Sequence, residues 1–293
     1  MKSVAKAAIL GTLLAASPAL AQPPEGTLAV PVQRLAAAPK VDGDLTDWAT
    51  AKWTKVKIQP ADDKVESKAV GDSEVELAVG VHGDMVYVAA RWPDSQADTT
   101  YRPWKVVGSK YKRSEDRDDG FAIRFHMDGE YDRCMISEKI YKVDVWTWSA
   151  GRTDPLGIAD DYHHVISTNP IDESAEYKNP SGSTTYIKKI RDEGTPSWEN
   201  TKAPKEVGEP TLPGVSTATT PSGSAADVAA KGRWADGKWS LEMARKLDTV
   251  HPDEDAVLSG GKAVQGAVAV FNHSHSENKS VSGFLTFDFS AVK

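Results

Sequence analysis

The sequence has a single cysteine, Cys134, among its 293 residues. One thiol excludes intrachain disulfides, Cys-x-x-Cys zinc sites, cysteine-ligated iron–sulfur clusters and the Cys-x-x-Cys-His attachment of c-type haem. Because unpaired cysteines are commonly buried, we expect Cys134 to be an inert thiol inside the protein, with intermolecular pairing as the alternative.

Long apolar runs are lacking after residue 21, since no later stretch approaches the roughly 18 apolar residues that a membrane helix needs. Residues 1–21 themselves have the features of a secretory signal. Lys2 and Lys6 give a positive start, residues 7–16 are mostly apolar, and small residues precede a cleavage position after Ala21. We therefore expect export to the periplasm and no membrane span.

The chain also lacks a basic segment. Its formal charge is −7, from 35 Lys and Arg against 42 Asp and Glu, and the basic residues are not gathered in one run. A surface that follows phosphates needs such a cluster. Nucleic acid is therefore not an expected partner.

Catalytic motifs are missing as well. There is no G-x-S-x-G elbow, no glycine-rich phosphate loop and no H-E-x-x-H pair. The acidic pairs Asp118–Asp119 and Asp160–Asp161 are adjacent in sequence, and successive side chains of a strand point to opposite faces. Neither pair can present two carboxylates to one substrate, so we do not expect the chain to be an enzyme.

Strand patterns dominate what is present. Residues 75–81 and 85–92 are β-rich runs around a glycine turn, and residues 232–234 and 238–245 form a second hairpin pattern. Further strand patterns lie at 121–127, 143–148, 266–271 and 284–289. Helix patterns are few and short. This arrangement predicts an all-β fold, an antiparallel β-sandwich.

Residues 170–226 differ in composition from the rest of the chain. Seven of the 17 prolines fall in this segment, and residues 202–224 are rich in Pro, Gly, Ser and Thr. Strand patterns lie on both sides, and neither half repeats the other. We therefore predict a loop-rich insertion within a single domain that spans residues 22–293.

An Asp-Gly turn at Asp42–Gly43 precedes two tryptophans, Trp48 and Trp53. This segment resembles the start of family 9 carbohydrate-binding modules, which are β-sandwiches. We expect both tryptophans to be part of the core, with sugar stacking as the alternative.

Several later segments occur in the order seen in one family. They are DDGFAIRF at 118–125, the Cys134–Met135 step, VDVWTWSAGR at 143–152, residues 153–161, AKGRWADGKW at 230–239 and AVFNHSHSENKSVS at 269–282. Together they resemble the haem-binding domain of ethylbenzene dehydrogenase γ subunits, which is related to the γ subunits of dimethyl sulfide dehydrogenase and of selenate and chlorate reductases. The resemblance spans residues 41–289.

The resemblance implies one non-covalent haem b with a Met thioether and a Lys amine as axial ligands. By position these are Met135 and Lys279, with Met127 as the alternative thioether. A thioether favours ferrous iron, which suits acceptance of electrons from a molybdenum–iron–sulfur partner. A lysine ligand must be deprotonated, so Lys279 requires a desolvated site.

Histidines offer other ligand sets. His273 and His275 would share a face if the segment is extended, and His163–His164 follow an acidic pair. Imidazoles of either pair could bind zinc or copper, or replace Lys279 on iron.

The same resemblance directs attention to residues beside the ligands. Arg124, Arg152 and Arg245 could pair with haem propionates through bidentate contacts, with ordinary ion pairs as the alternative. We expect at most one of the three to do so. Trp146 and Trp148 would share a strand face and could wall the porphyrin, but core packing explains them equally well.

These features predict a periplasmic b-type cytochrome that transfers single electrons, as the γ subunit of a molybdenum oxidoreductase complex or like one. Its expected partners are molybdenum and iron–sulfur subunits or a soluble periplasmic cytochrome c. The alternative is a carbohydrate-binding module that holds oligosaccharide through exposed aromatic side chains.

Overall fold

The computed structural model describes residues 24–61, 73–217, 220–274 and 279–291. Residues 1–21, where the sequence predicts a signal peptide, lie outside the described residues, as does His275. No helix in the described part of the chain has the length and apolarity to cross a bilayer.

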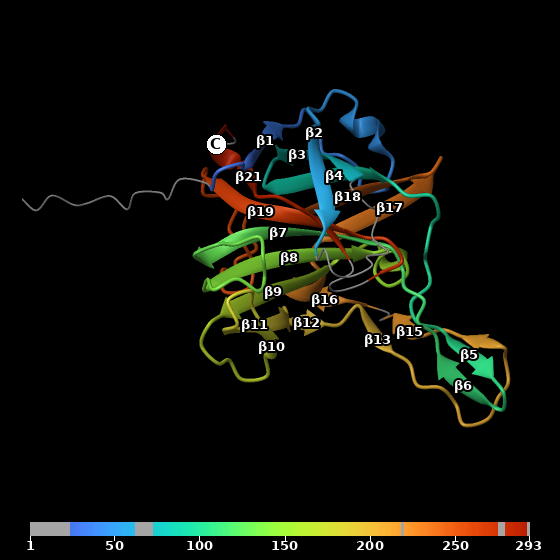
Figure 1. Cartoon of the computed structure of the whole chain (residues 1–293). Coiled ribbons are helices and arrows are strands. Elements are labelled where there is room, and N and C mark those ends of the chain that lie inside the picture. The colour runs from blue at the N-terminus through green and yellow to red at the C-terminus, as the bar shows by residue number, and fades with distance from the viewer. Residues whose placement is uncertain (1–23, 62–72, 218–219, 275–278, 292–293) are drawn as a thin grey trace, which may run out of the picture.

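The described chain is an antiparallel β-sandwich whose main sheet folds over on itself (Figure 1). The strands of one layer are, in sheet order, β10 (Ala175–Lys178), β11 (Thr184–Arg191), β9 (Asp160–Ser167), β8 (Tyr141–Ser149), β7 (Gly120–Gly129) and β19 (Ala263–Phe271). The order continues through β20 (Ser280–Ser282), β2 (Thr54–Pro60), β3 (Ser73–His82), β4 (Met85–Pro93), β18 (Lys238–Lys246) and β17 (Ala229–Ala235). The predicted all-β sandwich is confirmed.

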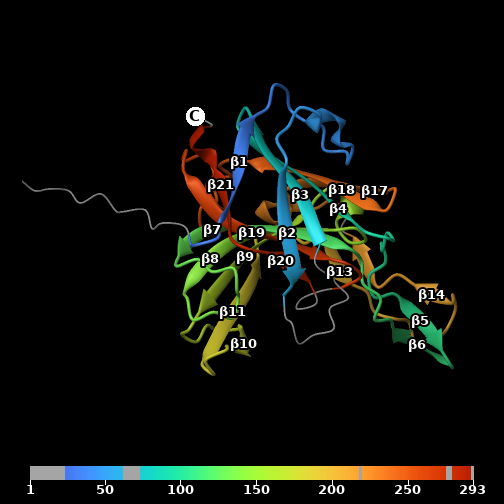
Figure 2. The same cartoon turned by 45° about the horizontal axis from the view of Figure 1, so that its top comes forward.

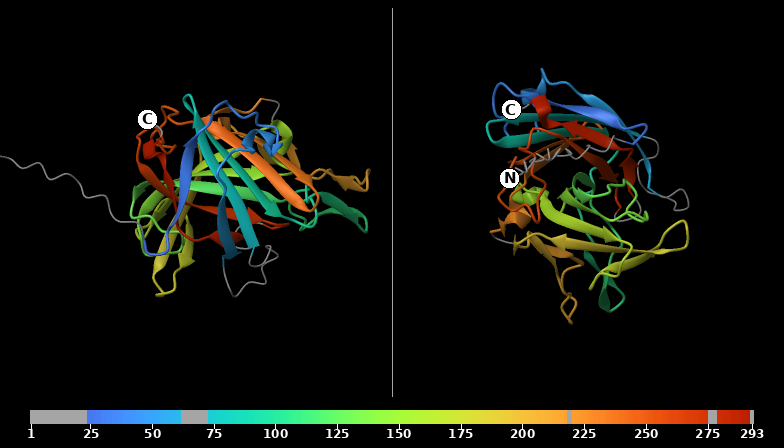
Figure 3. Two further views of the ribbon diagram at one scale, coloured as in Figure 1. Left: turned by 90° about the horizontal axis from the view of Figure 1, so that it is seen from above. Right: turned by 90° about the vertical axis from the view of Figure 1, so that its left-hand side faces the viewer.

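Two strands join the layers beside this path. β1 (Leu28–Arg34) pairs in parallel with both β3 and β21 (Leu285–Asp288), and β21 pairs with β19. Figure 3 shows the resulting layers, with the blue and teal strands β1 and β3 over the green strands β7 and β8. A bridge between Ile158 and Ala229 joins the segment before β9 to β17 at the other side.

The interior between the layers is apolar because alternate side chains of each strand point inward. Phe121, Ile123 and Phe125 of β7 are all fully buried there. Trp148 of β8 meets Trp92 of β4 edge-on at 6.2 Å and Trp239 of β18 at 5.0 Å between ring centroids. We call this buried set the interior core.

The segment 40–53 covers the outward face of β3, β4 and β18, where Trp48 packs with Ala78, Tyr87 and Ala244. It contains the short 3-10 helix η1 (Leu45–Trp48). The buried carboxylate of Glu242 accepts hydrogen bonds from the indole of Trp48 at 2.8 Å and from the backbone of Asp42 and Gly43. Trp48 is buried, as expected of a core residue, whereas Trp53 is half-buried under the guanidinium of Arg91.

Residues 170–226 contribute short strands as well as loops. β10 and β11 extend the main sheet, as Figure 2 shows at the lower edge of the molecule. The remaining strands are β12 (Gly194–Thr195), β13 (Trp198–Asn200), β14 (Thr211–Leu212), β15 (Val215–Thr217) and β16 (Ser222–Gly223), with the 3-10 helix η3 (Ser224–Ala226). β14 pairs with β5 (Trp104–Val107), which pairs with β6 (Lys110–Arg113) in a small projecting sheet (Figure 1).

The remaining short helices are η2 (Asp154–Leu156) and η4 (Phe289–Ala291).

The expectation of a buried Cys134 is wrong, because its side chain is exposed. Cys134 lies in the 130–140 connection between β7 and β8, where the chain turns at the surface. Solvent, rather than packed side chains, surrounds the thiol.

Candidate functional site

The layer formed by β7, β8, β9 and β19 is apolar on both faces. Its inward side chains belong to the interior core. The opposite face, which we call the outer face, carries the alternate residues. They are Ala122 and Arg124 of β7, Val143 and Val145 of β8, Tyr162, His164 and Ile166 of β9, and Ala267 and Ala269 of β19.

A second apolar cluster covers this outer face. Its buried members are Tyr131, Tyr141, Val143, Val145, Ile166 and Ile187. We call it the outer cluster. Tyr131 meets Tyr141 at 5.7 Å and Phe284 at 5.9 Å between ring centroids, so the 130–140 connection packs down onto the sheet. A sheet with a second apolar face buries that face against a loop, a partner or a ligand.

The two candidate methionines lie on opposite faces of this layer. Met135 is half-buried and packs against the outer cluster. Met127 packs against the interior core, because it has the same strand parity as Phe125. Of the two, Met135 is the thioether at the outer face.

Arg124 projects from β7 on the outer face. Its guanidinium lies 5.4 Å from the ring centroid of Tyr131 and donates to the carbonyl oxygens of Asp132, at 3.3 Å, and Arg133. No ion pair of Arg124 is present within the described residues. The charge is thus held at this face by carbonyl oxygens without a carboxylate.

Lys279 and His164 lie close enough at the outer face for the charge of Lys279 to lower the pKa of His164. Lys279 is half-buried, and its carbonyl oxygen accepts from the backbone of Ala61 at 2.9 Å. Burial lowers the pKa of His164 well below its usual range, and the positive charges of Lys189, Arg124, His163 and Lys279 lower it further. His164 is therefore neutral at pH 7, and its buried Nδ1 has no hydrogen-bond partner among the described residues.

Trp146 and Trp148 lie on the other face. Both are fully buried in the interior core, where Trp146 meets Phe125 at 5.0 Å between ring centroids and Trp148 donates to Asp154 at 3.0 Å. The structure therefore does not bring these tryptophans together with Met135 and Arg124.

The other two candidate arginines form ion pairs with buried aspartates away from the outer face. Arg152 pairs with the buried carboxylate of Asp118 at 3.1 Å and lies 4.3 Å from the ring centroid of Tyr101. Arg245 is fully buried among aspartates on the interior side. Only Arg124 of the three arginines projects from the outer face.

His163 and His164 lie on opposite faces of β9 and do not form a pair. His163 points inward and its Nδ1 lies 2.5 Å from Asp192, whereas His164 points outward. His273 has a positive φ of 46° and lies 3.3 Å from Asp98. The acidic pairs divide in the same way, since Asp160 binds Trp198 while Asp161 binds Arg245.

The donor set of the outer face fits a haem. It offers a thioether, a half-buried amine, a neutral imidazole with a free nitrogen and a guanidinium without a carboxylate partner among the described residues. Soft and neutral nitrogen donors suit iron, and Arg124 suits a propionate. Ala122, Ala267 and Ala269 have small side chains, so the adjoining part of the sheet carries no bulky groups.

Sequence reasoning missed the aromatic part of this face. Tyr131 and Tyr141 organise the outer cluster, yet neither lies in a quoted motif. The alternation of Tyr141, Val143 and Val145 with the inward residues of β8 was the available signal, because it makes both faces of the strand apolar.

Aromatic exposure elsewhere is limited. Trp234 is the one exposed aromatic side chain among the described residues, at 36%, and its indole donates to the carbonyl oxygen of Asp94 at 3.0 Å. A stacking platform for a sugar usually needs more than one such ring.

Comparisons with known proteins place the chain in one family by sequence. Residues 46–281 match the family described as ethylbenzene dehydrogenase. No curated protein matches the chain. Among solved structures, a family 9 carbohydrate-binding module from Caldicellulosiruptor kristjanssonii in complex with cellotriose is 11% identical, with 89% of this chain and 93% of that chain covered and a TM-score of 0.36. A protein from Bacteroides uniformis described as carbohydrate-binding is 9% identical, with coverage of 89% and 99% and a TM-score of 0.38.

Proposed function

Because the chain belongs to the ethylbenzene dehydrogenase family, we propose that it is a haem b protein that transfers single electrons and has no catalytic site of its own. The haem would lie against the outer face of β7, β8, β9 and β19. The proposal rests on one observation above the others. Met135 and Arg124 both lie on this face, and Lys279, far along the chain from them, directly precedes β20, whose Val281 pairs with Ala269 of the same face.

The chemistry of each side chain suggests its role in holding the haem. Met135 would present its sulfur and Lys279 its amine to iron. Arg124 would bind a propionate, since a guanidinium forms bidentate contacts with a carboxylate. The outer cluster would exclude water, which favours the neutral form of Lys279 that ligation requires.

A bound haem b supplies a one-electron couple, and its axial donors and surroundings set the potential. The chain's contribution is to hold the donors and keep the face dry. His164 is the competing donor, because it is neutral and its Nδ1 is free among the described residues.

Partner and location extend the proposal. Family membership supports association with the molybdenum and iron–sulfur subunits of an oxidoreductase, and a soluble cytochrome c is the other electron partner to test. Export to the periplasm is supported by the pattern of residues 1–21. Carbohydrate binding has less support, because the described residues expose a single aromatic ring.

Absorption spectroscopy tests the function directly. Protein made in haem-replete cells, or mixed with haemin, is expected to show a Soret band and sharp α and β bands on reduction. Met135→Ala and Lys279→Ala are each expected to shift the spectrum from low spin or to lose the haem.

Met127→Ala is the matched control, because this methionine packs in the interior core instead of on the outer face. It should leave the spectrum unchanged. His164→Ala separates the competing donor, since a changed spectrum in this variant with an unchanged Lys279→Ala would assign the imidazole instead of the amine. A colourless protein that binds cello-oligosaccharides would contradict the proposal.

A further inference from the structure

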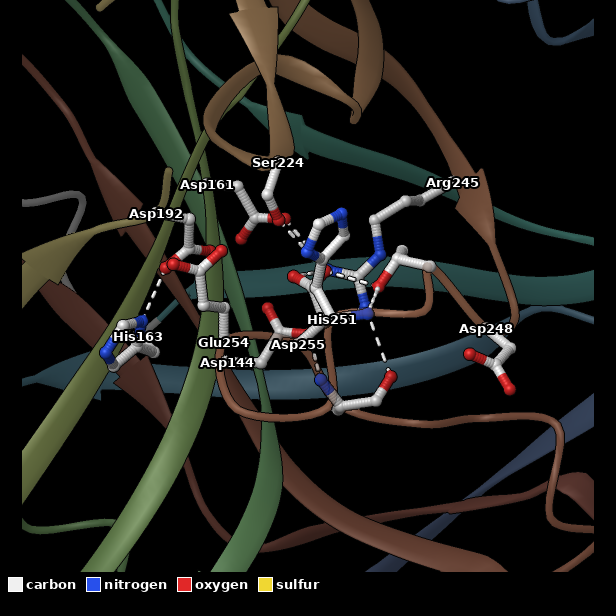
Figure 4. Close-up of polar contacts among 12 residues, drawn as sticks. Asp144, Asp161, His163, Asp192, Ser224, Arg245, Asp248, His251, Glu254 and Asp255 are labelled. Atoms are coloured by element: carbon white, nitrogen blue, oxygen red, sulfur yellow. Dashed lines mark hydrogen bonds and ion pairs between the residues drawn. The ribbon is translucent and has the colours of Figure 1, made fainter. Parts of the chain in front are cut away.

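A buried cluster of charges lies on the interior side of the same layer, in the region drawn in Figure 4. Arg245 of β18 contacts Asp144 of β8 at 2.7 Å, Asp161 of β9 at 2.8 Å and Asp255 at 2.9 Å. All four side chains are at most 1% exposed, and the ring centroid of Trp146 lies 4.7 Å from the guanidinium. We call these residues the acidic cluster.

Charge is not balanced within the acidic cluster. One guanidinium faces three carboxylates, so two negative charges lack a counterpart if all three are ionised. Burying an uncompensated carboxylate is strongly unfavourable, because the charge loses its hydration. The neighbouring Asp192 adds a fourth carboxylate, which pairs with His163 at 2.5 Å. The protein therefore requires further cations or protons at this place.

Specific oxygen atoms are left without partners. Asp144 Oδ1, Asp161 Oδ1 and Asp192 Oδ2 are buried and have no hydrogen-bond partner among the described residues. Asp144 and Asp161 are 0% exposed and Asp192 is 3% exposed. One carboxylate oxygen from each of Asp144, Asp161 and Asp255 lies within 4.8 Å of the others. Buried oxygens that lack donors are unusual in native proteins.

A surface cavity adjoins the cluster. It has a volume of about 530 Å³ and is lined in part by Glu193, Asp227, His251, Ser224 and Thr249. The hydroxyls of Ser224 and Thr249 both donate to Asp255, so the wall of the cavity is also the wall of the acidic cluster. Glu193 and Asp227 give the lining two carboxylates against the one amine of Lys246, and this excess of negative charge attracts cations.

We propose that the acidic cluster binds one divalent cation of the Ca²⁺ type, held by the free oxygens of Asp144 and Asp161 with Asp192 beside them. The available donors are carboxylate and hydroxyl oxygens, the ligand class that hard cations prefer. A doubly charged ion would balance the two excess charges, and Arg245 would keep its three contacts on the other carboxylate oxygens. The site is separate from the outer face, so it does not depend on haem.

Protons are the competing solution. Burial raises the pKa of Asp161 well above its usual range, and the nearby carboxylate of Asp144 raises it further. A protonated Asp161 would remove one excess charge without any metal. Asp161→Asn separates the two solutions. Its amide mimics a protonated acid, but it lacks the negative charge that balances a divalent cation and so binds one more weakly.

Calorimetry and thermal unfolding distinguish them. Full-length protein is freed of metal with a chelator and titrated with CaCl₂, with MgCl₂ as a comparison. Binding heat and a rise of the unfolding temperature with Ca²⁺ concentration are expected for the wild type. Asp161→Asn should weaken the binding by more than about 100-fold, since even second-shell changes cost about 10- to 100-fold in metal affinity.

Asp128→Asn is the matched control, because Asp128 is an exposed carboxylate at the end of β7. It should bind Ca²⁺ like the wild type. If the wild type gives neither heat nor a temperature shift with either cation, the cation site is refuted and protons balance the cluster. This measurement on the wild type holds even if Asp161→Asn does not fold, and neither result bears on the haem spectrum.

Discussion

Asp119 shows how a single residue joins distant segments of the sandwich. Its buried carboxylate accepts from the indole of Trp239 at 3.0 Å, from the backbone of Asp98 at 2.7 Å and from the backbone of His273 at 2.9 Å. Burial raises the pKa of Asp119 to about 6, even though the hydrogen bonds from these three donors lower the pKa. The donors position the carboxylate, but they do not fully compensate for its desolvation.

The raised pKa predicts a pH dependence of stability. Between about pH 4 and 6 the folded protein holds a proton on Asp119 that the unfolded chain has released, so this group's contribution falls as pH rises through that window. Relative to Asp119→Asn, the wild-type free energy of unfolding should decrease by about 2 kcal/mol from pH 4 to pH 7.

Urea unfolding of both proteins at several pH values measures this difference. Asp128→Asn serves as the control, because an exposed carboxylate should give a difference that stays nearly constant with pH. A constant difference for Asp119→Asn as well would show that the Asp119 carboxyl titrates at the same pH in the folded and unfolded chain.

Residue-level prediction from sequence worked where strand parity decides the answer. Parity separates Asp160 from Asp161, which bind Trp198 and Arg245 in the structure. Asp118 and Asp119 precede β7, but they too bind different partners. Parity alone does not say which face is interior when both faces are apolar. For that reason the face of Trp146 and Trp148 could not be assigned from the sequence.

At the scale of elements, the hairpin of β17 and β18 depends on a glycine that faces an indole. A Cβ atom on Gly232 would lie 2.2 Å from Cζ2 of Trp148. Trp148 has little room to move, because it packs between Trp92 and Trp239. The glycine therefore lets β17 lie close to the interior core.

Gly232→Ala is expected to destabilise the protein by about 1–3 kcal/mol or more, since overpacking of a rigid core forces backbone shifts. Gly208→Ala is the control, because a Cβ there has no neighbour within 4 Å. Its effect should be within about 0.5 kcal/mol. Urea unfolding measures both, and equal stabilities of the two variants would show that Trp148 yields to the added methyl group.

Elements with strong turn signals could be predicted, and elements without them could not. The hairpin patterns at 75–92 and 232–245 have glycine turns, and the structure forms both, as β3–β4 and β17–β18. β9 was missed, because residues 160–167 carry charged and imidazole side chains that partner with Arg245 and Asp192. Their pattern depends on tertiary contacts, which local propensity does not contain.

At the scale of the whole molecule, the sandwich class followed from the sequence but its closure did not. The sheet passes from one layer to the other through β19, β20 and β2. β1 pairs in parallel with both β3 and β21. These pairings bring together chain ends more than 200 residues apart, such as Leu28 and Leu285. Register between such distant strands is set by packing on both faces, so alternation within one strand cannot reveal it.

The layer of β7, β8, β9 and β19 has two apolar faces, and this separates stability from cofactor binding. The inward face holds Trp148, which is fully buried, whereas Met135 on the outward side is half-buried. Without haem, Met135→Ala should therefore cost about 1 kcal/mol of unfolding free energy. Trp148→Ala should cost about 3–5 kcal/mol, as large-to-small changes in a packed core do.

Urea unfolding of the haem-free proteins, followed by circular dichroism, compares the two variants, and haemin titration then compares their binding. Met135→Ala should be folded and impaired in haem ligation, while any Trp148→Ala that remains folded should keep the axial ligands. The reverse pattern, with intact ligation in Met135→Ala and lost ligation in folded Trp148→Ala, would move the cofactor to the interior side.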